Sequence, residues 1–393
     1  MKKPKIRFAE YIEEYQPIPL ASLLEFKNGI NADGGKFGQG IKCISVLDIL
    51  SDEFITYDSI RGKVTVEPAL EKLYAVHDGD VVFQRSSENR KDAGMANIYV
   101  DSFRNAVFSG FVIRGKKKGT FNSRYLGYLL RSPTARKDIS TKANGEIHVN
   151  VGQDSLSQVI VHMPLSIAEQ NKAASLFDYL TQKIALQRRK VELLKDSYKC
   201  ILNCLLVRVL NENENQKTLL FSDICSLSKE RIPAENAGEC VCIELEHLES
   251  GTGRRLGCTN AKLQSSIKSV FSPNDVLFGK LRPYLRKYWL ADCAGICSTE
   301  IWVLKAEAVF PRYLYYLIQS EQFQMLANVS SGSKMPRSDW QYIADAEFDI
   351  PSANDQENFI AVMSALEKKI SISQDVLDRL LTLKTGFLQQ LFD

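Results

Sequence analysis

The sequence predicts an α+β protein in which two pseudo-twofold-related mixed α/β domains are joined by two long helices that form an antiparallel coiled coil. Three observations predict this fold class: an internal repeat, a heptad pattern after each copy of the repeat, and a polar linker between the copies. The chain has 393 residues, 45% of them hydrophobic and 25% charged, with a net charge of +3. This composition is typical of a folded globular protein, and the length suits two or three domains.

The internal repeat has a period of about 190 residues, which is far longer than a solenoid unit. One pair of segments shares the pattern Asp-Val-X-Phe, a second pair shares Tyr-Leu-X-Tyr-Leu, and a third pair ends in proline. We interpret the repeat as one domain and its connector, used twice. The matching segments are residues 79–85 with 274–280, 125–132 with 313–320, and 162–164 with 349–351.

A long helix is expected after the first copy. Ser166 is suited to cap its beginning, and no proline or glycine interrupts residues 165–210. Apolar residues recur there in alternating steps of three and four, which is the spacing of a coiled-coil seam, with one polar position among them. At 1.5 Å per residue the helix would be roughly 60–70 Å long. The predicted seam comprises Phe177, Leu180, Ile184, Gln187, Val191 and Leu194, and continues to Tyr198, Ile201 and Leu205.

A second helix with the same pattern is expected after Ser352, and its polar seam position falls in the same layer. The ordinary interpretation of such a seam is a helix that lies on its own globule. About five heptads exceed what a domain of this size can cover, so pairing of the two helices is favoured, with Gln187 and Ser373 setting the register. The second seam comprises Met363, Leu366, Ile370, Ser373, Leu377 and Leu380, and continues to Lys384, Phe387 and Leu391.

The predicted domain organisation follows from these elements. Residues 211–217 form a polar linker without apolar anchors, and short apolar runs at 80–83 and 111–113 predict strands. Buried helices are expected at 125–130 and 313–318. The expected segments are a first domain at 1–164, a first long helix at 165–212, a second domain at 213–351 and a second long helix at 352–393.

The sequence lacks the common motifs for catalysis or metal binding. Residues 29–36 fail the phosphate-loop pattern, and no dinucleotide fingerprint is present. Residues 37–40 faintly resemble the adenosylmethionine loop of methyltransferases, but the Asn/Asp-Pro-Pro-aromatic partner motif is missing. The nine cysteines form no Cys-X-X-Cys pair, and the four histidines do not pair at ligand spacing. We therefore expect no catalytic residue, metal or cofactor in this chain.

The sequence also bears on localisation. No apolar run approaches the length of a membrane span, and no secretory signal follows the charged first residues. The odd number of cysteines is most simply read as reduced thiols, so a cytoplasmic protein is expected.

Polar and basic loops follow equivalent points of the two copies. The sharpest is 281–289, with three basic and three aromatic residues, and its counterpart is 84–91. A second pair of loops, 142–148 and 330–337, precedes the last strand of each domain. Each loop alone could be a solvated turn, but their repetition favours binding of bases and phosphates. The candidate DNA-binding residues are Arg85, Ser86, Asn144, Lys280, Arg282, Tyr284, Arg286, Ser333 and Lys334.

Over essentially its whole length the sequence resembles the specificity subunit of type I restriction–modification systems. Four phrases in order support the resemblance, together with the duplicated domain-and-helix pattern. At residues 84–87 the sequence of the first domain differs from the sequence that is usual in the family at this place. The phrases are Gln-Asn-Lys-Ala at 170–173, Asp-Val-Leu-Phe-Gly-Lys-Leu-Arg-Pro-Tyr at 275–284, Ser-Thr-Glu-Ile-Trp-Val-Leu at 298–304, and Leu-Lys-Thr-Gly-Phe-Leu-Gln-Gln-Leu-Phe at 383–392.

This resemblance implies that the chain is a non-catalytic subunit of a larger complex. Each domain would be a target recognition domain that reads one half of a bipartite double-stranded DNA target. The paired helices would set the spacer and dock two modification (methyltransferase) subunits. S-adenosylmethionine, ATP and Mg would be bound by partner subunits, the last two by restriction (motor-nuclease) subunits. Two alternatives remain: a coiled-coil scaffold whose globules bind protein, and a stand-alone modification enzyme.

Overall fold

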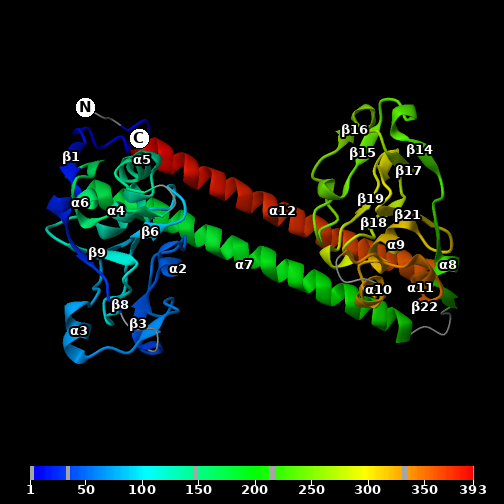
Figure 1. The fold of residues 1–393 in the computed structure, drawn as a ribbon, viewed down its shortest axis with the longest axis horizontal. Helices are drawn as coiled ribbons and strands as arrows, with labels where there is room; N and C mark the ends of the chain where they lie inside the picture. The colour runs from blue at the N-terminus through cyan, green and yellow to red at the C-terminus, as the bar shows by residue number, and fades with distance from the viewer. Residues whose placement is uncertain (1–3, 32–35, 146–147, 212–216, 330–334, 393) are drawn as a thin grey trace. The chain divides into compact units, whose positions relative to one another are not determined.

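The structure is a computed structural model that describes residues 4–31, 36–145, 148–211, 217–329 and 335–392, with the backbone alone at 204–211. Its contacts divide the chain into two compact units. Unit 1 comprises Met1–Arg189 and Gln374–Asp393, and unit 2 comprises Lys190–Ser373. Each unit contains one globule and part of each long helix. The helices are α7 (Ile167–Asn211) and α12 (Ala353–Phe392) (Figure 1).

Unit 1 is built on a four-stranded antiparallel sheet with the order β2-β9-β5-β7. A three-stranded sheet, β4-β3-β8, and an antiparallel pair, β1-β11, accompany it. The strands and helices of the globule are β1 (Gln16–Pro19), α1 (Leu20–Leu23), β2 (Leu24–Asn28), β3 (Phe37–Ile44), α2 (Val46–Ile49), β4 (Lys63–Val64), α3 (Pro68–Leu73), β5 (Val81–Gln84), β6 (Ser86–Ser87), β7 (Ala96–Ile98), β8 (Val107–Phe108), β9 (Val112–Lys117), α4 (Ser123–Leu130), α5 (Pro133–Thr141), β10 (Val149–Asn150), α6 (Gln153–Ser157) and β11 (Ile160–Met163).

Unit 2 has a four-stranded antiparallel sheet with the order β13-β21-β18-β19, a five-stranded sheet, β14-β17-β20-β15-β16, and the pair β12-β22. Its globule comprises β12 (Lys217–Leu220), α8 (Phe221–Ile224), β13 (Cys225–Leu227), β14 (Arg231–Pro233), η2 (Ala234–Asn236), β15 (Val241–Ile243), η3 (Leu245–His247), β16 (Thr259–Asn260), η4 (Ala261–Leu263), β17 (Ile267–Phe271), β18 (Val276–Gly279), η5 (Pro283–Leu285), β19 (Tyr288–Leu290), β20 (Gly295–Ser298), β21 (Ile301–Ala306), α9 (Pro311–Leu317), α10 (Glu321–Ala327), α11 (Trp340–Ala344) and β22 (Glu347–Ile350).

The two four-stranded sheets follow the same chain order, because β2, β9, β5 and β7 correspond in turn to β13, β21, β18 and β19. The turn before the central strand is also the same. Gly79 and Asn274 adopt left-handed backbones with φ of 84° and 71°, a conformation that glycine and asparagine tolerate best. The next residue, Asp80 or Asp275, accepts a hydrogen bond from the backbone N–H three residues earlier. The predicted α+β class, with mixed globules and two long helices, is confirmed.

Each long helix contributes side chains to the core of a globule. In unit 1, the ring of Phe177 on α7 lies 5.0 Å from Tyr128 of α4 and 5.4 Å from Phe392 of α12, measured between centroids. In unit 2, Phe359 of α12 lies 5.7 Å from Tyr316 of α9. All five rings are buried. The helices are therefore part of the hydrophobic core of each unit and could not be removed without exposing it.

A buried glutamine fixes the beginning of each long helix to its globule. In unit 1, Gln170 donates from Nε2 to the carbonyl of Pro164 at 2.8 Å and accepts at Oε1 from the N–H of Asn122 at 2.8 Å. In unit 2, Gln356 makes the equivalent two bonds at 3.1 Å, to the proline before α12 and from the N–H of Phe310. The predicted caps also form, because Ser166 and Ser352 each accept from the N–H three residues later.

Replacing either glutamine by alanine is expected to destabilise only its own unit, by about 1–3 kcal/mol, because two buried backbone groups lose their partner. All three tryptophans, Trp289, Trp302 and Trp340, lie in unit 2. In denaturant, Gln356→Ala should therefore shift the tryptophan-fluorescence transition, whereas Gln170→Ala should shift only the circular-dichroism signal. Equal shifts of the fluorescence transition by both variants would contradict this assignment.

The N-terminal segment is held on unit 1 by a buried ion pair. Arg7 donates from Nε and Nη2 to the two carboxylate oxygens of Glu169, both at 2.7 Å. Glu169, in the first turn of α7, is only 1% exposed and also accepts from the hydroxyl of Tyr15 at 3.3 Å. The backbone N–H of Ile6 donates to the carbonyl of Gln390 near the end of α12. The segment thus joins the beginning of one long helix to the end of the other within unit 1.

Candidate nucleic-acid interface

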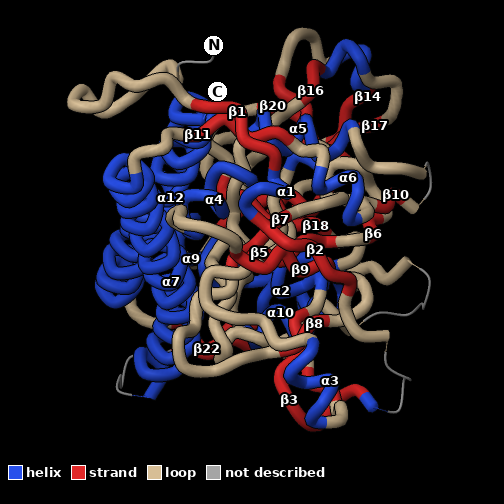
Figure 2. The backbone as a smooth tube through the Cα atoms, turned by 90° about the vertical axis from the view of Figure 1, so that its left-hand side faces the viewer, coloured by secondary structure: helices blue, strands red, loops and turns tan. Residues whose placement is uncertain are grey.

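In unit 1 the fold brings the two predicted loops together. Strand β6 pairs with β10, which places Ser86 opposite Asn150, and the Ser86 hydroxyl donates to the Asn150 side chain. Asn144 and Asn150 also exchange two backbone hydrogen bonds, at 2.7 and 2.9 Å. Arg85, directly before β6, is half-buried, and Asn144 is exposed. The predicted residues Arg85, Ser86 and Asn144 therefore lie close together at the end of the central strand β5. Figure 2 shows the strands β6 and β10 of this region side by side.

In unit 2 the corresponding loops meet in the same way. The N–H of Lys280 donates to the carbonyl of Glu300 at 3.0 Å, and its carbonyl accepts from the N–H of Ser338 at 2.9 Å. In unit 1, Arg85 makes the same two backbone bonds, with Phe111 and Val151. Lys280 thus occupies the position of Arg85. Two further predicted residues, Ser333 and Lys334, lie outside the described residues.

Arg282 and Arg286 stand at the two ends of the short helix η5, in left-handed backbone conformations with φ of 53° and 49°. This conformation costs a residue with a Cβ roughly 1–2 kcal/mol. Backbone hydrogen bonds stabilise it: the N–H of Arg282 donates to Pro336, and the carbonyl of Arg286 accepts from Gly251. Both side chains are exposed, and Tyr284 between them is 57% exposed. The loop therefore presents two arginines and a tyrosine on a strained backbone.

Other cations near this loop are bound within the protein. Arg337 donates to both carboxylate oxygens of Glu300, and these hydrogen bonds hold the pKa of that carboxyl below its ordinary value, with the charge of Lys280 adding to the effect. Lys287 donates to the backbone carbonyl of Leu245. Within the part of the chain that the structure describes, Arg282 and Arg286 make no side-chain hydrogen bond or ion pair. Both therefore remain available to a ligand.

Unit 1 uses its arginines differently. The guanidinium of Arg90 donates to the carbonyls of Ser140, Ala143 and Gly145 at 2.8–3.1 Å. Arg136 binds three carbonyls of residues 91–94 in the same manner, and burial lowers its pKa to about 10. Arg90 and Arg136 therefore shape the two loops. The role of Arg136 was not predicted, and no signal in the sequence could have shown it, because the carbonyls it binds lie more than forty residues away.

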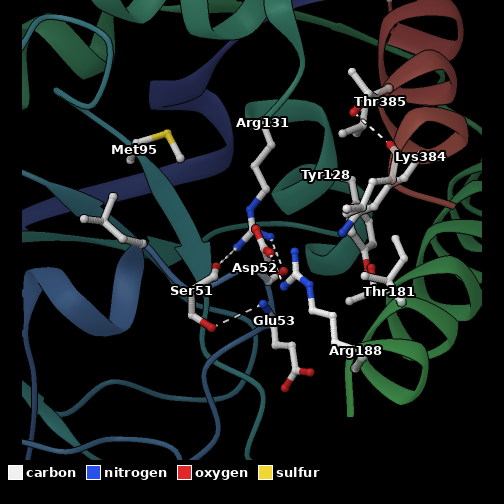
Figure 3. A pocket seen from close by; sticks show the side chains of 15 residues that line it. Ser51, Asp52, Glu53, Met95, Tyr128, Arg131, Thr181, Arg188, Lys384 and Thr385 are labelled. Carbon is white, nitrogen blue, oxygen red and sulfur yellow. Dashed lines mark hydrogen bonds and ion pairs between the residues drawn. The ribbon is translucent and has the colours of Figure 1, made fainter. Parts of the chain in front are cut away.

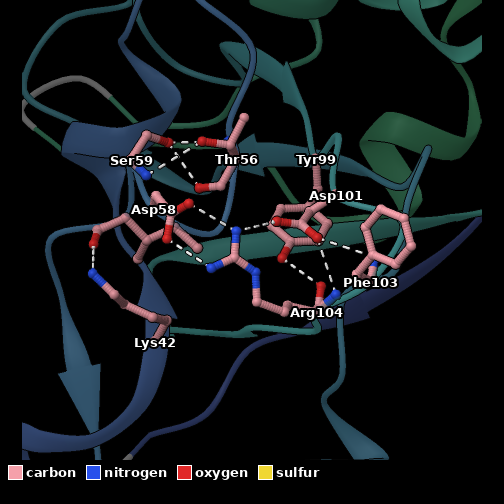
Figure 4. Close-up of polar contacts among 9 residues, drawn as sticks. Lys42, Thr56, Asp58, Ser59, Tyr99, Asp101, Phe103 and Arg104 are labelled. Atoms are coloured by element: carbon pink, nitrogen blue, oxygen red, sulfur yellow. Dashed lines mark hydrogen bonds and ion pairs between the residues drawn. The ribbon is translucent and has the colours of Figure 1, made fainter.

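An arginine elsewhere on the globule of unit 1 is also bound internally (Figure 4). Arg104 donates to both carboxylate oxygens of Asp58, at 2.7 and 2.8 Å, and to Asp101 at 3.0 Å. These contacts raise the pKa of Arg104, with the hydrogen bonds to Asp58 contributing most, and they lower the pKa of Asp58. Arg104 is solvent-accessible, but its guanidinium is already paired with the carboxylates of Asp58 and Asp101. It therefore provides a control for Arg282 and Arg286.

Apart from Leu205, whose side chain lies outside the described residues, the predicted seam residues on the two long helices are buried or half-buried. Tyr179, Leu186 and Leu193, which are spaced seven residues apart on α7, are instead 56–65% exposed. Helix α7 thus has two apolar stripes: the seam residues, which are covered, and Tyr179, Leu186 and Leu193, which are exposed. The covered residues are Phe177, Leu180, Ile184, Val191, Met363, Ser373 and Leu377, which are buried, and Gln187, Leu194, Leu366, Ile370 and Leu380, which are half-buried.

The described residues contain no group of three or more histidine, cysteine or acidic side chains placed to hold a metal ion. None of the described helices has the length and apolar character needed to cross a membrane.

No family model matches the chain, and no curated protein matches its sequence. Solved structures do match. The crystal structure of a type I restriction–modification system S subunit from M. genitalium has a TM-score of 0.60 and 12% identity, and the match covers 100% of this chain and 99% of the other. A chain from a study of complex assembly and conformational transition of the type I R-M system has a TM-score of 0.58 and 12% identity, with 96% and 97% covered. The chain has the fold of the type I restriction–modification specificity subunit.

Proposed function

We propose that this chain is the sequence-specific DNA-binding subunit of a type I restriction–modification complex. The observation that carries the proposal is the same pair of loops, at the end of the central strand of both units, joined by the same backbone hydrogen bonds. In unit 2 these loops present Arg282 and Arg286, whose side chains have no partner among the described residues. Free guanidinium groups bind phosphates and the acceptor edge of guanine, and amide side chains such as Asn144 suit adenine. Each globule then reads one half of a bipartite target.

The long helices set the spacing between the half-sites in this proposal. Contacts within each unit support antiparallel pairing. In unit 1 the beginning of α7 packs on the end of α12, through Phe177 and Phe392. In unit 2 a later part of α7 meets an early part of α12, where the hydroxyl of Tyr198 donates to Glu367 at 3.4 Å. Gln187 and Ser373, at the polar layer of the seams, set the register.

The exposed stripe of Tyr179, Leu186 and Leu193 is the proposed docking surface for the two modification subunits. Exposed apolar residues in a heptad row suit a partner helix. The chain itself performs no chemistry: S-adenosylmethionine is bound by the modification subunits, and ATP and Mg by the restriction subunits. The complex acts on double-stranded DNA in the cytoplasm.

Methylation of host DNA provides the test. The chain is co-expressed with the neighbouring open reading frames of its source genome, and the host methylome is sequenced. Methyladenine is expected in a bipartite motif with a fixed gap. Replacing residues 16–164 by those of a related chain should change only one half of that motif, because each globule contributes one set of loops. A change in both halves would contradict the proposal that each globule reads one half of the motif. A stable complex without salt-dependent DNA binding would favour a protein-binding scaffold.

A further inference from the structure

Unit 1 contains a cavity of about 250 Å³ where the loop after α2 meets both long helices (Figure 3). Ser51 and Asp52 line it from the loop, Arg131 from the residue after α4, Arg188 from α7 and Lys384 from α12. Apolar side chains, among them those of Ile184 and Leu388, complete the wall. The cavity does not include any of the proposed DNA-binding residues.

Three cations converge on this cavity. Arg131 donates to the carbonyls of Asp52, at 2.7 Å, Ser51, at 3.3 Å, and Ala96, at 3.4 Å, which fixes the guanidinium in place. Arg188 forms an ion pair with the Asp52 carboxylate at 2.7 Å. Lys384 is half-buried at a seam position, and among the described residues its ammonium group has neither a hydrogen bond nor an ion pair. Its Nζ lies 6.0 Å from the centroid of the Tyr128 ring.

The charge of Lys384 is therefore poorly compensated. Burial lowers its pKa, and the positive charge of Arg131 acts in the same direction. A half-buried ammonium group without a partner is costly unless an anion binds it. Figure 3 shows Arg131 and Arg188 beside Asp52, with the end of Lys384 near Tyr128 and Thr181. Two carboxylates line the cavity with these three cations: Asp52, already paired with Arg188, and Glu53. Both act against the lowering of the pKa of Lys384.

The internal repeat allows the cavity of unit 1 to be compared with the equivalent position in unit 2. In unit 2, at the offset of 186 that relates the helices, Tyr198 stands where Lys384 stands in unit 1. Gln319 similarly replaces Arg131, at the offset of 188 that relates α9 to α4. The hydroxyls of Tyr198 and Tyr288 both donate to Oε1 of Gln319, at 3.0 and 3.1 Å. Unit 2 thus has a hydrogen-bonded network of Tyr198, Tyr288 and Gln319, with Glu367 beside it, at the position where unit 1 has three cations.

We propose that the cavity of unit 1 binds one phosphate group, with Lys384 and Arg188 as its cationic ligands and the fixed guanidinium of Arg131 adding positive charge beside them. Donors that approach from two helices can share one oxyanion, and a guanidinium group binds phosphate through paired N–H donors. The group belongs either to a free phosphate or to the DNA backbone. In both cases it joins the globule to α7 and α12 within unit 1, so its binding stabilises that junction.

The test uses the full-length chain and two lysine variants on α12. Lys384→Tyr introduces the residue that unit 2 has at this place, and Lys369→Tyr changes an exposed lysine outside the cavity. Thermal midpoints are measured against increasing inorganic phosphate, with chloride replacing it at constant ionic strength. The wild-type chain and Lys369→Tyr are expected to show a saturable rise. Lys384→Tyr should bind phosphate at least about tenfold more weakly, a difference of about 1.4 kcal/mol. Arg188→Gln provides a second variant should Lys384→Tyr lose its circular-dichroism spectrum.

A second arm distinguishes the source of the phosphate and rests on the proposed DNA-binding function. The salt dependence of duplex DNA binding by the assembled complex is compared for the same variants. If inorganic phosphate has no effect but Lys384→Tyr alone reduces the salt slope by about one, the ligand is a DNA phosphate. The proposal is overturned if both arms are unchanged, or if Lys369→Tyr and Lys384→Tyr respond equally. The first arm stands even if the chain binds no DNA.

Discussion

Replacing Arg282 and Arg286 together by alanine is expected to reduce the affinity of the assembled complex for its target DNA by about 2–6 kcal/mol, or roughly 30-fold to 10⁴-fold. This range follows from about 1–3 kcal/mol for each well-placed arginine contact with a base. Both side chains are exposed and have no internal partner among the described residues, so their loss removes donors without disrupting the globule. The double variant is expected to retain its thermal midpoint.

The same variant can distinguish base contacts from phosphate contacts. If the arginines bind phosphates, the slope of log affinity against log salt should fall by about 0.9 for each lost contact, and all sequences should weaken alike. If they bind guanine, substitution of particular G·C pairs in the target should cease to matter. Arg104→Ala is the matched control, because Arg104 is already paired with Asp58 and Asp101. An equal loss of affinity in the control and the double variant would exclude a specific role for the loop.

Replacing Arg7 by alanine is expected to destabilise unit 1 by about 3–5 kcal/mol, the usual cost of removing one partner of a buried ion pair. Glu169 is 1% exposed, and its remaining contact, from Tyr15, is a single hydrogen bond at 3.3 Å. The change should shift the circular-dichroism transition in denaturant. The tryptophan fluorescence should not shift, because all three tryptophans are in unit 2.

Two further variants test the cause of that loss. Arg7→Ala combined with Glu169→Gln should recover part of the stability, because no uncompensated charge is then buried. Lys172→Ala removes an ion pair with Glu10 that is exposed on both sides, and it should have no measurable effect. If the single variant Arg7→Ala were as stable as Lys172→Ala, the N-terminal segment would not contribute to the fold of unit 1.

The periodic features of this protein could be predicted from its sequence alone. The repeated Asp-Val-X-Phe segments predict a strand in each copy, and β5 and β18 are found there. The seam of Phe177, Leu180 and Ile184 is buried as its spacing requires. Ser166 and Ser352 cap their helices as expected. These features depend on residues that are close in sequence or regularly spaced. The order of residues along the chain is therefore enough to predict them.

The availability of the basic side chains was decided by the tertiary structure. Arg90 and Arg282 both lie in loops singled out by composition, yet Arg90 is bound to three carbonyls and Arg282 has no side-chain partner among the described residues. The cavity around Lys384 likewise depends on a loop, a helix end and both long helices meeting in unit 1. A guanidinium or ammonium group binds whatever acceptor the fold brings within about 3 Å. The sequence determined which positions carry a charged side chain. Only the packing of distant segments determined which of these side chains remain available to a ligand.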